Sequence, residues 1–367
     1  MSANEIKHYP CSSCGADLLF DPKDGMLTCP YCGHKEAVPE SKEQVEEQSF
    51  EQQLHVRPEE MTALAANALE VQCQSCGAKS IFMPPEVAGR CEFCGVQIVA
   101  QPKSADPILT PSGLLPFHIT QQDAGTELKQ WLSTRWFAPS GLKQFAQPEA
   151  IQGVYLPFWT YDACTRTNYT GQRGEHYYET ETYYERDAQG HEVQRTREVQ
   201  HTRWYPASGT VLGAFDDLLV AATGSLSSEH LADLEPWDLE QLRPYDPAYL
   251  SGFKAQRYQV DLAEGFDRAK EMMVPTIESD VRNDIGGDEQ QIDSMDTSYY
   301  NVTFKHLLLP VYAGAYRYNG KLFQIVVNGR TGEIQGNRPY SVWKITLLVV
   351  TLLIVVLLLV LAINSGK

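Results

Sequence analysis

The stretch that decides the fold is residues 11–33, CSSCGADLLFDPKDGMLTCPYCG, which recurs as residues 73–95, CQSCGAKSIFMPPEVAGRCEFCG. Each copy holds two Cys-x-x-Cys pairs with fourteen residues between their inner cysteines, and the second copy begins 62 positions after the first. Two such pairs at this spacing bring four thiolates into a tetrahedron around one zinc ion. The sequence therefore predicts two zinc sites, one on Cys11, Cys14, Cys29 and Cys32 and the other on Cys73, Cys76, Cys91 and Cys94.

The two copies also agree at positions that hold no metal ligand. A glycine and an alanine follow the first pair in each copy, and a phenylalanine, a proline and a final glycine match as well. Glycine at this place suits a tight turn whose backbone N–H groups point at the sulfurs. We therefore predict small β zinc ribbons over residues 1–40 and 71–100, holding two structural Zn²⁺ ions. Four thiolates fill each coordination sphere, so neither ion has an open position for activating water.

The other end of the chain is strongly apolar. Residues 345–363 contain no charged side chain, and only two threonines interrupt them. At about 1.5 Å per residue, a helix of this length just crosses a hydrocarbon core of about 30 Å. The sequence predicts a single-pass, C-terminal transmembrane helix from Ile345 to Ile363, which makes the protein tail-anchored and in contact with membrane lipid.

The two ends together predict a compartment. Zinc thiolates persist in a reducing cytosol, and the matched ribbon spacing disfavours the alternative that these cysteines form disulfides. Arg338 and Lys344 precede the apolar stretch and only Lys367 follows it, a small bias toward a cytosolic N-terminal side. We expect a single-pass protein of the bacterial inner (cytoplasmic) membrane with its N-terminal domains in the cytoplasm.

Composition divides the rest of the chain. Residues 41–70 are rich in Glu and Gln and predict an acidic linker with a short helix, and residues 101–114 predict a proline-rich linker. Residues 115–339 are rich in aromatic side chains and contain both helical and strand patterns. The predicted fold class is therefore multi-domain, with an α+β domain of antiparallel sheet and hairpins between the ribbons and the transmembrane helix.

Two helices are readable in residues 115–339. Thr120-x-x-Asp123 has the form of a capping box ahead of an apolar helical face. Asp261-x-x-Glu264 opens a second helix, whose apolar stripe runs to Val281. Proline lacks the N–H that a helix interior needs, so we expect Pro275 to kink or break this helix.

Strand signals occupy the remainder. Leu-Pro pairs at 115–116, 156–157 and 309–310 predict strand starts, since proline is tolerated there. Residues 313–327 predict a hairpin around Asn319-Gly320, a pair suited to a type I′ turn.

Residues 176–204 predict a long hairpin with a Glu/Tyr strand facing an Arg-bearing strand. A three-residue loop at 187–189 gives the cross-strand pairs Glu181 with Arg195, Glu179 with Arg197, Tyr183 with Val193, and Tyr177 with Val199. Each such pair contributes about 0.2–1 kcal/mol.

Few aliphatic residues are present in this hairpin, so one hypothesis is that it projects from the domain as an exposed protein-docking surface. The docking residues are predicted to be Tyr177, Tyr178, Tyr183, Tyr184, Arg195 and Arg197. The alternative is that the hairpin is another polar-faced strand pair within a twisted sheet.

Charge and motifs narrow the classes of function. The chain has 30 basic and 47 acidic side chains, a formal net charge of −17. Nucleic-acid binding draws most of its free energy from Lys and Arg, so this balance makes nucleic acid an unlikely partner. No phosphate-loop motif is present, which excludes a P-loop helicase, and no other catalytic motif indicates an enzyme.

The chain resembles the bacterial membrane-anchored double zinc-ribbon proteins, which carry labels taken from the transcription-factor-B ribbon or the primosomal helicase. The resemblance rests on the ribbons and on the segments Leu115-Pro116-Phe117, Arg135-Trp136-Phe137-Ala138-Pro139, Gly153-Val154-Tyr155-Leu156-Pro157-Phe158-Trp159 and Val327-Asn328-Gly329-Arg330-Thr331-Gly332. It implies association with phage-shock-type coat proteins and flotillin-like (SPFH) membrane proteins during envelope stress. The helicase label has no support, because the likeness there is limited to the cysteine pairs.

The leading hypothesis is a non-enzymatic, membrane-tethered zinc-ribbon adaptor that docks partner proteins in membrane remodelling. One alternative is a membrane-bound regulator that binds nucleic acid. Another is an enzyme of unknown reaction in residues 115–339.

Overall fold

The computed structural model describes residues 9–39, 44–55, 69–72, 79–82, 88–90, 97–99, 109–135, 151–186, 191–318, 321–337 and 341–365. In this part of the chain the fold is mostly β, built on one nine-stranded, largely antiparallel sheet with few helices. The predicted α+β class for residues 115–339 is therefore wrong. Both expected helices exist, but three very long strands outweigh them.

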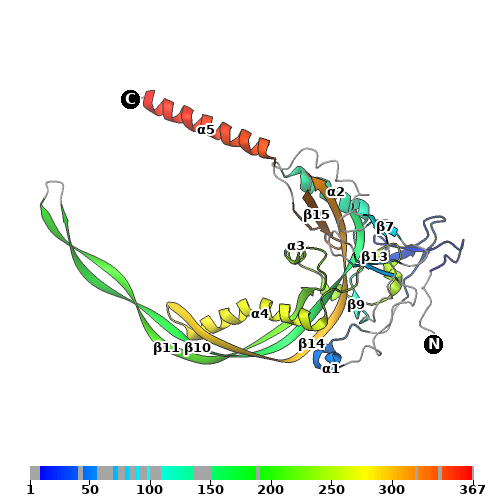
Figure 1. Ribbon diagram of the computed structural model, residues 1–367, viewed down its shortest axis with the longest axis horizontal. Helices are drawn as coiled ribbons and strands as arrows, with labels where there is room; N and C mark the ends of the chain where they lie inside the picture. The colour runs from blue at the N-terminus through cyan, green and yellow to red at the C-terminus, as the bar shows by residue number, and fades with distance from the viewer. Residues whose placement is uncertain are drawn as a thin grey trace.

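The sheet has the strand order β11-β10-β14-β15-β16. Its long members are β10 (Ile151–Arg186), β11 (Glu192–Ala221) and β14 (Glu289–Tyr318), followed by β15 (Lys321–Asn328) and β16 (Ile334–Gly336). Short strands add at the edges: β4 (Gln48–Ser49), β9 (Gly113–Leu114), β12 (Arg243–Pro244) and β13 (Lys254–Ala255). Figure 1 shows β10, β11 and β14 as one curved ribbon that runs out from a compact body.

The helices are α1 (Phe50–Leu54), α2 (Gln121–Ser133), α3 (Ser228–Ala232), α4 (Leu262–Ile285) and α5 (Val342–Ser365), with the 3₁₀ turns η4 (Leu239–Gln241) and η5 (Pro247–Leu250). The capping box at Thr120 and Asp123 is confirmed, and Asp261 caps α4 by accepting the N–H of Glu264. Helix α4 lies along the concave side of the curved ribbon (Figure 1).

Pro275 does not interrupt α4, which continues from Leu262 to Ile285. Met273, two residues before it, and Ile277, two residues after it, are both buried against the sheet. A proline inside a helix costs about 3 kcal/mol, and burial of two large apolar side chains offsets a cost of that size. The predicted break is therefore wrong because packing on both sides holds the helix together.

Two of the three Leu-Pro pairs lie inside strands rather than at their starts. Pro157 is within β10 and Pro310 is within β14. The carbonyl of Pro157 accepts the N–H of Ala222, just past the end of β11, and that of Pro310 accepts the N–H of Gly329, just past β15. Each proline thus faces the end of a neighbouring strand, where a missing N–H interrupts no ladder.

The ribbon bends where both neighbours of β10 carry a bulge at Asp162. On the β11 side Asp217 has φ 48°, and on the β14 side Asn301 has φ 54°. Both are in the left-handed region, which Asn and Asp tolerate better than other residues with a Cβ. Asp162 Oδ1 accepts the N–H of Asp217 at 2.6 Å, which fixes one bulge to the central strand. Paired bulges at one level strengthen twist and bend the sheet there.

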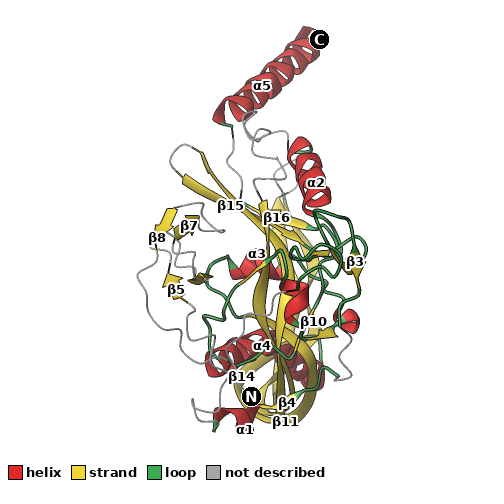
Figure 2. Cartoon of the chain, turned by 90° about the vertical axis from the view of Figure 1, so that its right-hand side faces the viewer, coloured by secondary structure: helices red, strands yellow, loops and turns green. Residues whose placement is uncertain are grey.

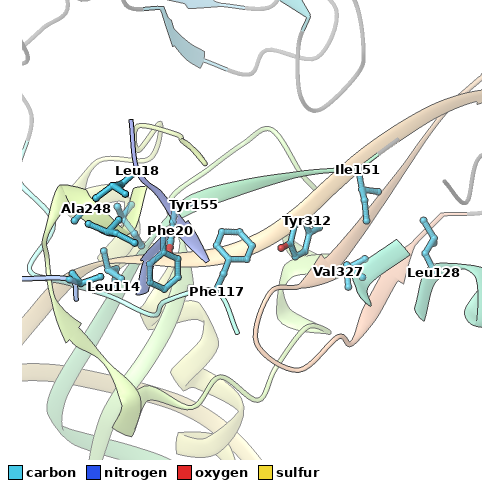
Figure 3. Packing of buried hydrophobic residues seen from close by; sticks show 14 of the residues in the cluster. Leu18, Phe20, Leu114, Phe117, Leu128, Ile151, Tyr155, Ala248, Tyr312 and Val327 are labelled. Carbon is cyan, nitrogen blue, oxygen red and sulfur yellow. The ribbon is translucent and has the colours of Figure 1, made fainter. Parts of the chain in front are cut away.

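The body is held by an aromatic core that includes part of the first predicted ribbon. Leu18 and Phe20 belong to the same buried cluster as Phe117, which lies between β9 and α2, and as Tyr155 and Tyr312 of the sheet (Figure 3). Residues 44–55, part of the predicted acidic linker, also pack on the sheet through Phe50.

The predicted membrane anchor is contradicted. Helix α5 extends away from the sheet (Figures 1 and 2), yet among the described residues no helix combines the length and apolar content that crossing a membrane requires. This finding contradicts the predicted transmembrane span from Ile345 to Ile363. It also contradicts the predictions that followed from that span: the tail-anchored topology, the lipid contact and the inner-membrane localisation.

Candidate metal centre and projecting arm

The four cysteines of the first predicted ribbon converge on one point. Their sulfurs all lie within 4.8 Å of one another. Cys11 Sγ is 3.6 Å from Cys32 Sγ, and Cys14 Sγ is 3.5 Å from Cys29 Sγ. A zinc tetrahedron with bonds of about 2.3 Å has sulfur–sulfur edges of about 3.8 Å. The thiolate donors and their spacing therefore fit a closed structural Zn²⁺ site.

Local backbone geometry creates this convergence. Each Cys-x-x-Cys pair sits at the tip of a tight turn, closed by the N–H of Gly15 to Cys11 O and the N–H of Gly33 to Cys29 O. Both glycines have φ near +75°, a conformation that a side chain would strain. The three-stranded sheet of β1 (Leu19–Asp21), β2 (Met26–Thr28) and β3 (Lys35–Glu36) brings the two turns together.

The thiols of this cluster differ in acidity. The backbone N–H of Cys32 points at Cys29 Sγ and lowers the pKa of that thiol to about 6. The N–H of Ala16 acts to lower the pKa of Cys14, but hydrogen bonds with the sulfurs of Cys29 and Cys32 outweigh it and raise that pKa to about 12. Zinc binding therefore has to displace protons, and the affinity of such a site falls as the pH falls.

The first ribbon is docked on the body. Phe20 meets Tyr249 edge to face at 5.2 Å, the N–H of Phe20 donates to Ser251 O, and Ser251 Oγ donates to Leu18 O at 2.6 Å. Tyr9 also donates its hydroxyl to Asp246. The metal centre thus stabilises a module that shares its core with the sheet.

The cysteines of the second predicted ribbon, Cys73, Cys76, Cys91 and Cys94, lie outside the described residues. The strands that flank them are described: β5 (Leu69–Gln72) pairs with β6 (Lys79–Phe82), and β7 (Ala88–Arg90) pairs with β8 (Gln97–Val99). The innermost pairs are Gln72 with Lys79 and Arg90 with Gln97. In the first ribbon Pro10 pairs with Asp17 and Thr28 with Lys35, at the same separation around a Cys-x-x-Cys pair.

The predicted Tyr-rich hairpin forms the far end of the ribbon. Strands β10 and β11 stay paired out to Arg186 and Glu192, whereas β14 begins only opposite Gly174. Beyond that level β10 and β11 continue with no third strand from the described residues beside them and project from the body (Figure 1). We call residues 175–186 and 192–203 the arm. The predicted hairpin is confirmed, and of the two hypotheses for it the projecting hairpin agrees with this pairing, while a protein-docking role stays a prediction.

The register of the arm differs from the prediction by two residues. Glu181 lies opposite Arg197, Tyr183 opposite Arg195, Glu179 opposite Val199, and Tyr177 opposite His201. The paired strands are joined by residues 187–191 rather than by a three-residue loop. A two-residue shift keeps every side chain on its face, so charge pairing alone selects neither register.

Aromatic and charged side chains cover the arm. Tyr178 and Tyr184 are 64% and 67% exposed, and Tyr183 is exposed as well. Arg197 forms an ion pair with Glu181 at 2.9 Å and lies over the Tyr183 ring. The remaining predicted docking residues are partnered too, because Arg195 pairs with Glu185 and Tyr177 lies under Arg203.

The turn between α4 and β14 fixes the base of the arm. The N–H of Asp288 donates to Gly174 O, and Asp288 Oδ2 accepts the N–H of His176 at 2.7 Å. His176 Nε2 is 2.8 Å from Glu289 Oε1, and this hydrogen bond lowers the pKa of Glu289.

A charged cluster that the sequence analysis missed lies at the bend. Lys305 is buried and pairs with Asp217 and with Glu47 from the 44–55 segment. Burial acts to lower the pKa of Lys305, but the ion pair with Asp217 outweighs it and the pKa is raised. The only sequence signal is a lysine within an apolar run, Phe304-Lys305-His306-Leu307. The lysine supplies the cation for these carboxylates, so we assign the cluster a structural role.

Comparisons with known proteins give one full-length likeness. No protein-family model matches the chain, and no solved structure does. Among curated proteins the chain is similar to "Uncharacterized protein YdjG" of Bacillus subtilis strain 168, at 27% identity over 355 residues. The match covers 93% of this chain and 92% of that protein, whose description names no activity, ligand or partner.

Proposed function

We propose that the protein is a non-enzymatic adaptor that docks partner proteins through its arm. The observation that carries this proposal is the length of β10 and β11 that continues beyond β14 and α4 and is covered by exposed tyrosines and arginines. These residue types dominate the energetics of protein interfaces, because they offer large contact area at a low entropic cost. A polar ribbon with no core of its own contributes little to stability, which favours a role in binding.

The metal centre supports this role by stabilising the first ribbon, which packs on the body. Zn²⁺ on Cys11, Cys14, Cys29 and Cys32 would stabilise the first ribbon, and the ribbon in turn packs on the sheet. We extend the same assignment to the second ribbon on the repeat of its sequence and on the matching strand pairs around its cysteines. The adaptor therefore holds two structural zinc ions.

The charge balance supports protein rather than nucleic acid as the partner. The formal net charge is −17, and the arm carries glutamates among its arginines, with Glu181 and Glu185 neutralising Arg197 and Arg195. A phosphate backbone needs uncompensated cations, and these two arginines are already paired.

An affinity pull-down from a bacterial lysate, read by mass spectrometry, tests the proposal. The bait is the full chain, beside a Tyr178→Ser/Tyr184→Ser variant that removes the two most exposed arm tyrosines. The matched control is Leu212→Ser/Tyr300→Ser, which removes two exposed apolar side chains outside the arm. Phage-shock-type coat proteins and SPFH proteins are the partners to look for, on the family resemblance.

We expect the wild type and the control to capture the same protein partners, and the arm variant to lose them at least about tenfold, or roughly 1.4 kcal/mol. Equal capture by the arm variant would remove the arm from the proposal. A wild-type bait that captures no specific protein would overturn the adaptor function itself.

A further inference from the structure

A groove of about 540 Å³ opens beside the last residues of β11, on the body rather than on the arm. Its floor is formed by Phe158 and by Leu219–Ala221 of β11. Its walls come from α3 and the residues after it, and from one turn of α4. The wall residues are Leu231, Ala232, Glu235, Arg268, Glu271 and Met272. We call this the β11 groove.

The floor of the groove is an open strand edge. In the described part of the chain β11 pairs with β10 alone. Ala222 donates its N–H to Pro157 O on β10, and Val220 lies opposite Trp159 two residues earlier. Backbone groups alternate in direction along an antiparallel strand, so the N–H and C=O groups of Leu219 and Ala221 point away from β10. Neither residue bonds to a further described strand on that side.

The two helices flank this edge from opposite faces of the sheet. Leu219 and Ala221 pack with the cluster that contains Leu231 of α3, whereas Val220 belongs to the cluster of α4. Successive side chains in a strand point to opposite faces, so α3 and α4 stand on the two sides of the edge. A chain added to β11 would lie between two helical walls and place alternate side chains against each.

The chemistry of the walls is apolar and acidic. Met272 is 45% exposed at the groove, although its neighbour Met273 is fully buried, and a flexible thioether adapts to apolar side chains of varied shape. Arg268 is engaged by Glu264 at 2.7 Å. Glu235 and Glu271 are exposed and have no ion-pair partner among the described residues, and partial desolvation of its carboxyl group raises the pKa of Glu235. A carboxylate in this position is stabilised by an incoming cation.

We propose that the β11 groove binds an extended segment of a partner protein, which adds to β11 as a strand and carries an apolar side chain for Met272 and a lysine or arginine for Glu235 and Glu271. The segment exchanges backbone hydrogen bonds with Leu219 and Ala221. This inference rests on the proposed adaptor function and supplies a second, sequence-selective contact on the body.

Fluorescence anisotropy with the full-length protein tests the groove directly. The probe is a fluorescein-labelled nine-residue peptide of alternating valine and threonine with a central lysine. One comparison peptide has glutamate in place of the lysine, and another has alternate backbone nitrogens methylated, which removes the hydrogen bonds a strand donates. We expect saturable binding of the lysine peptide, binding of the glutamate peptide at least about tenfold weaker, and none of the methylated peptide.

Two protein variants locate the binding. Glu235→Gln/Glu271→Gln should lower the affinity for the lysine peptide about five- to tenfold, which brings it close to the affinity for the glutamate peptide. Glu192→Gln/Glu198→Gln removes two carboxylates from the arm instead and should leave binding unchanged. Ala221→Pro removes one outward N–H and leaves the hydrogen bonds to β10 intact, and the variant should fold because proline is tolerated on an open edge. It should weaken the binding of every peptide that binds the wild type, because one backbone hydrogen bond to the peptide is lost.

Absence of saturable binding, or equal binding of all three peptides, would overturn the inference. So would a Glu235→Gln/Glu271→Gln variant that still prefers lysine over glutamate as the wild type does. If the pull-down captures partners while the lysine peptide does not bind, the groove assignment fails and the adaptor stands. If the wild-type bait captures no protein partner, the proposed adaptor function is wrong whatever the result with the peptides.

Discussion

The two halves of the β10–β11 ribbon consist of the same two strands but are held together differently. Between the bend and Gly174, β14 pairs along one side and α4 covers one face, so that Thr165, Thr167 and Tyr169 of β10 are buried. Beyond Gly174, in the arm, most side chains of both strands are exposed. A two-stranded ribbon with no third layer is marginal in water, so stability resides in the supported half.

The two halves also differ in the pattern of their side chains. The supported half alternates small or aromatic residues toward α4 with polar residues away from it, as in Tyr169 beside Asn168. The arm has no such alternation, and its cohesion comes from cross-strand pairs such as Glu181 with Arg197. Substitutions should therefore act on global stability in the supported half and on local order or binding in the arm.

The largest effect is expected at the metal centre, in the first ribbon that packs on the body. Cys29→Ser removes one zinc ligand, and because Leu18 and Phe20 share the body's core, we expect a loss of at least about 4 kcal/mol in the free energy of unfolding. Zinc content by mass spectrometry should fall by one equivalent. Cys164→Ser, at a half-buried cysteine outside the cluster, is the control and should keep both values. Unchanged zinc content in Cys29→Ser would refute the site.

Helix α4 offers the sharpest contrast between neighbours. Met273→Ala empties a fully buried position against the sheet and should cost about 2–5 kcal/mol in urea unfolding. Met272→Ala, one residue earlier, alters a side chain at the surface and should stay within about 0.5 kcal/mol. Similar losses for the two variants would mean that α4 does not support the ribbon as described.

The bend between body and ribbon depends on residues with positive φ. Asn301→Val places a β-branched side chain at φ 54°, and we expect a loss of about 1–2 kcal/mol. Asn301→Gly relaxes the same position and should be near neutral. Thermal unfolding gives the stabilities, and small-angle scattering reports the bend. If valine is tolerated as well as glycine, the bulge is not a constraint on the shape.

Acid should weaken the body through His306, which lies opposite Trp159 on the body side of the bend. Burial lowers the pKa of His306 to about 4 in the folded state, against about 6.5 when unfolded. The unfolded chain then binds the extra proton between these values, so this contribution is complete above pH 6.5 and declines as the pH falls toward 4. We expect a loss of about 1 kcal/mol between pH 7.5 and 5.5, and His306→Gln should flatten that part of the profile. An unchanged slope in the variant would assign the acid sensitivity elsewhere.

Sequence patterns predicted elements whose cause is local. The period of the apolar residues and the caps at Thr120 and Asp261 were sufficient for α2 and α4, and the alternation of Glu, Tyr and Arg was sufficient for a long hairpin. The convergence of Cys11, Cys14, Cys29 and Cys32 follows from their spacing, and their sulfurs do lie within 4.8 Å of one another.

Features set by distant contacts escaped prediction. Nothing near Phe20 indicates that it packs on Tyr249, and nothing near Pro157 indicates that it faces the end of β11. The arm register failed for a related reason, since charges spaced by two residues satisfy either pairing and the loop length decides. The membrane span was inferred from the length and apolar content of residues 345–363, and the finding for α5 contradicts it.

The smallest effect is expected in the arm, and it tests the register directly. Arg197 pairs with Glu181 across the strands at 2.9 Å, with both side chains exposed. Exposed pairs contribute about 0.2–1 kcal/mol at most, so Arg197→Ala and Glu181→Ala should leave global unfolding unchanged. A double-mutant cycle on amide exchange in the arm should give a coupling of roughly 0.3 kcal/mol that high salt reduces. Coupling of Glu181 to Arg195 instead would mean that the strands pair two residues away from the register described.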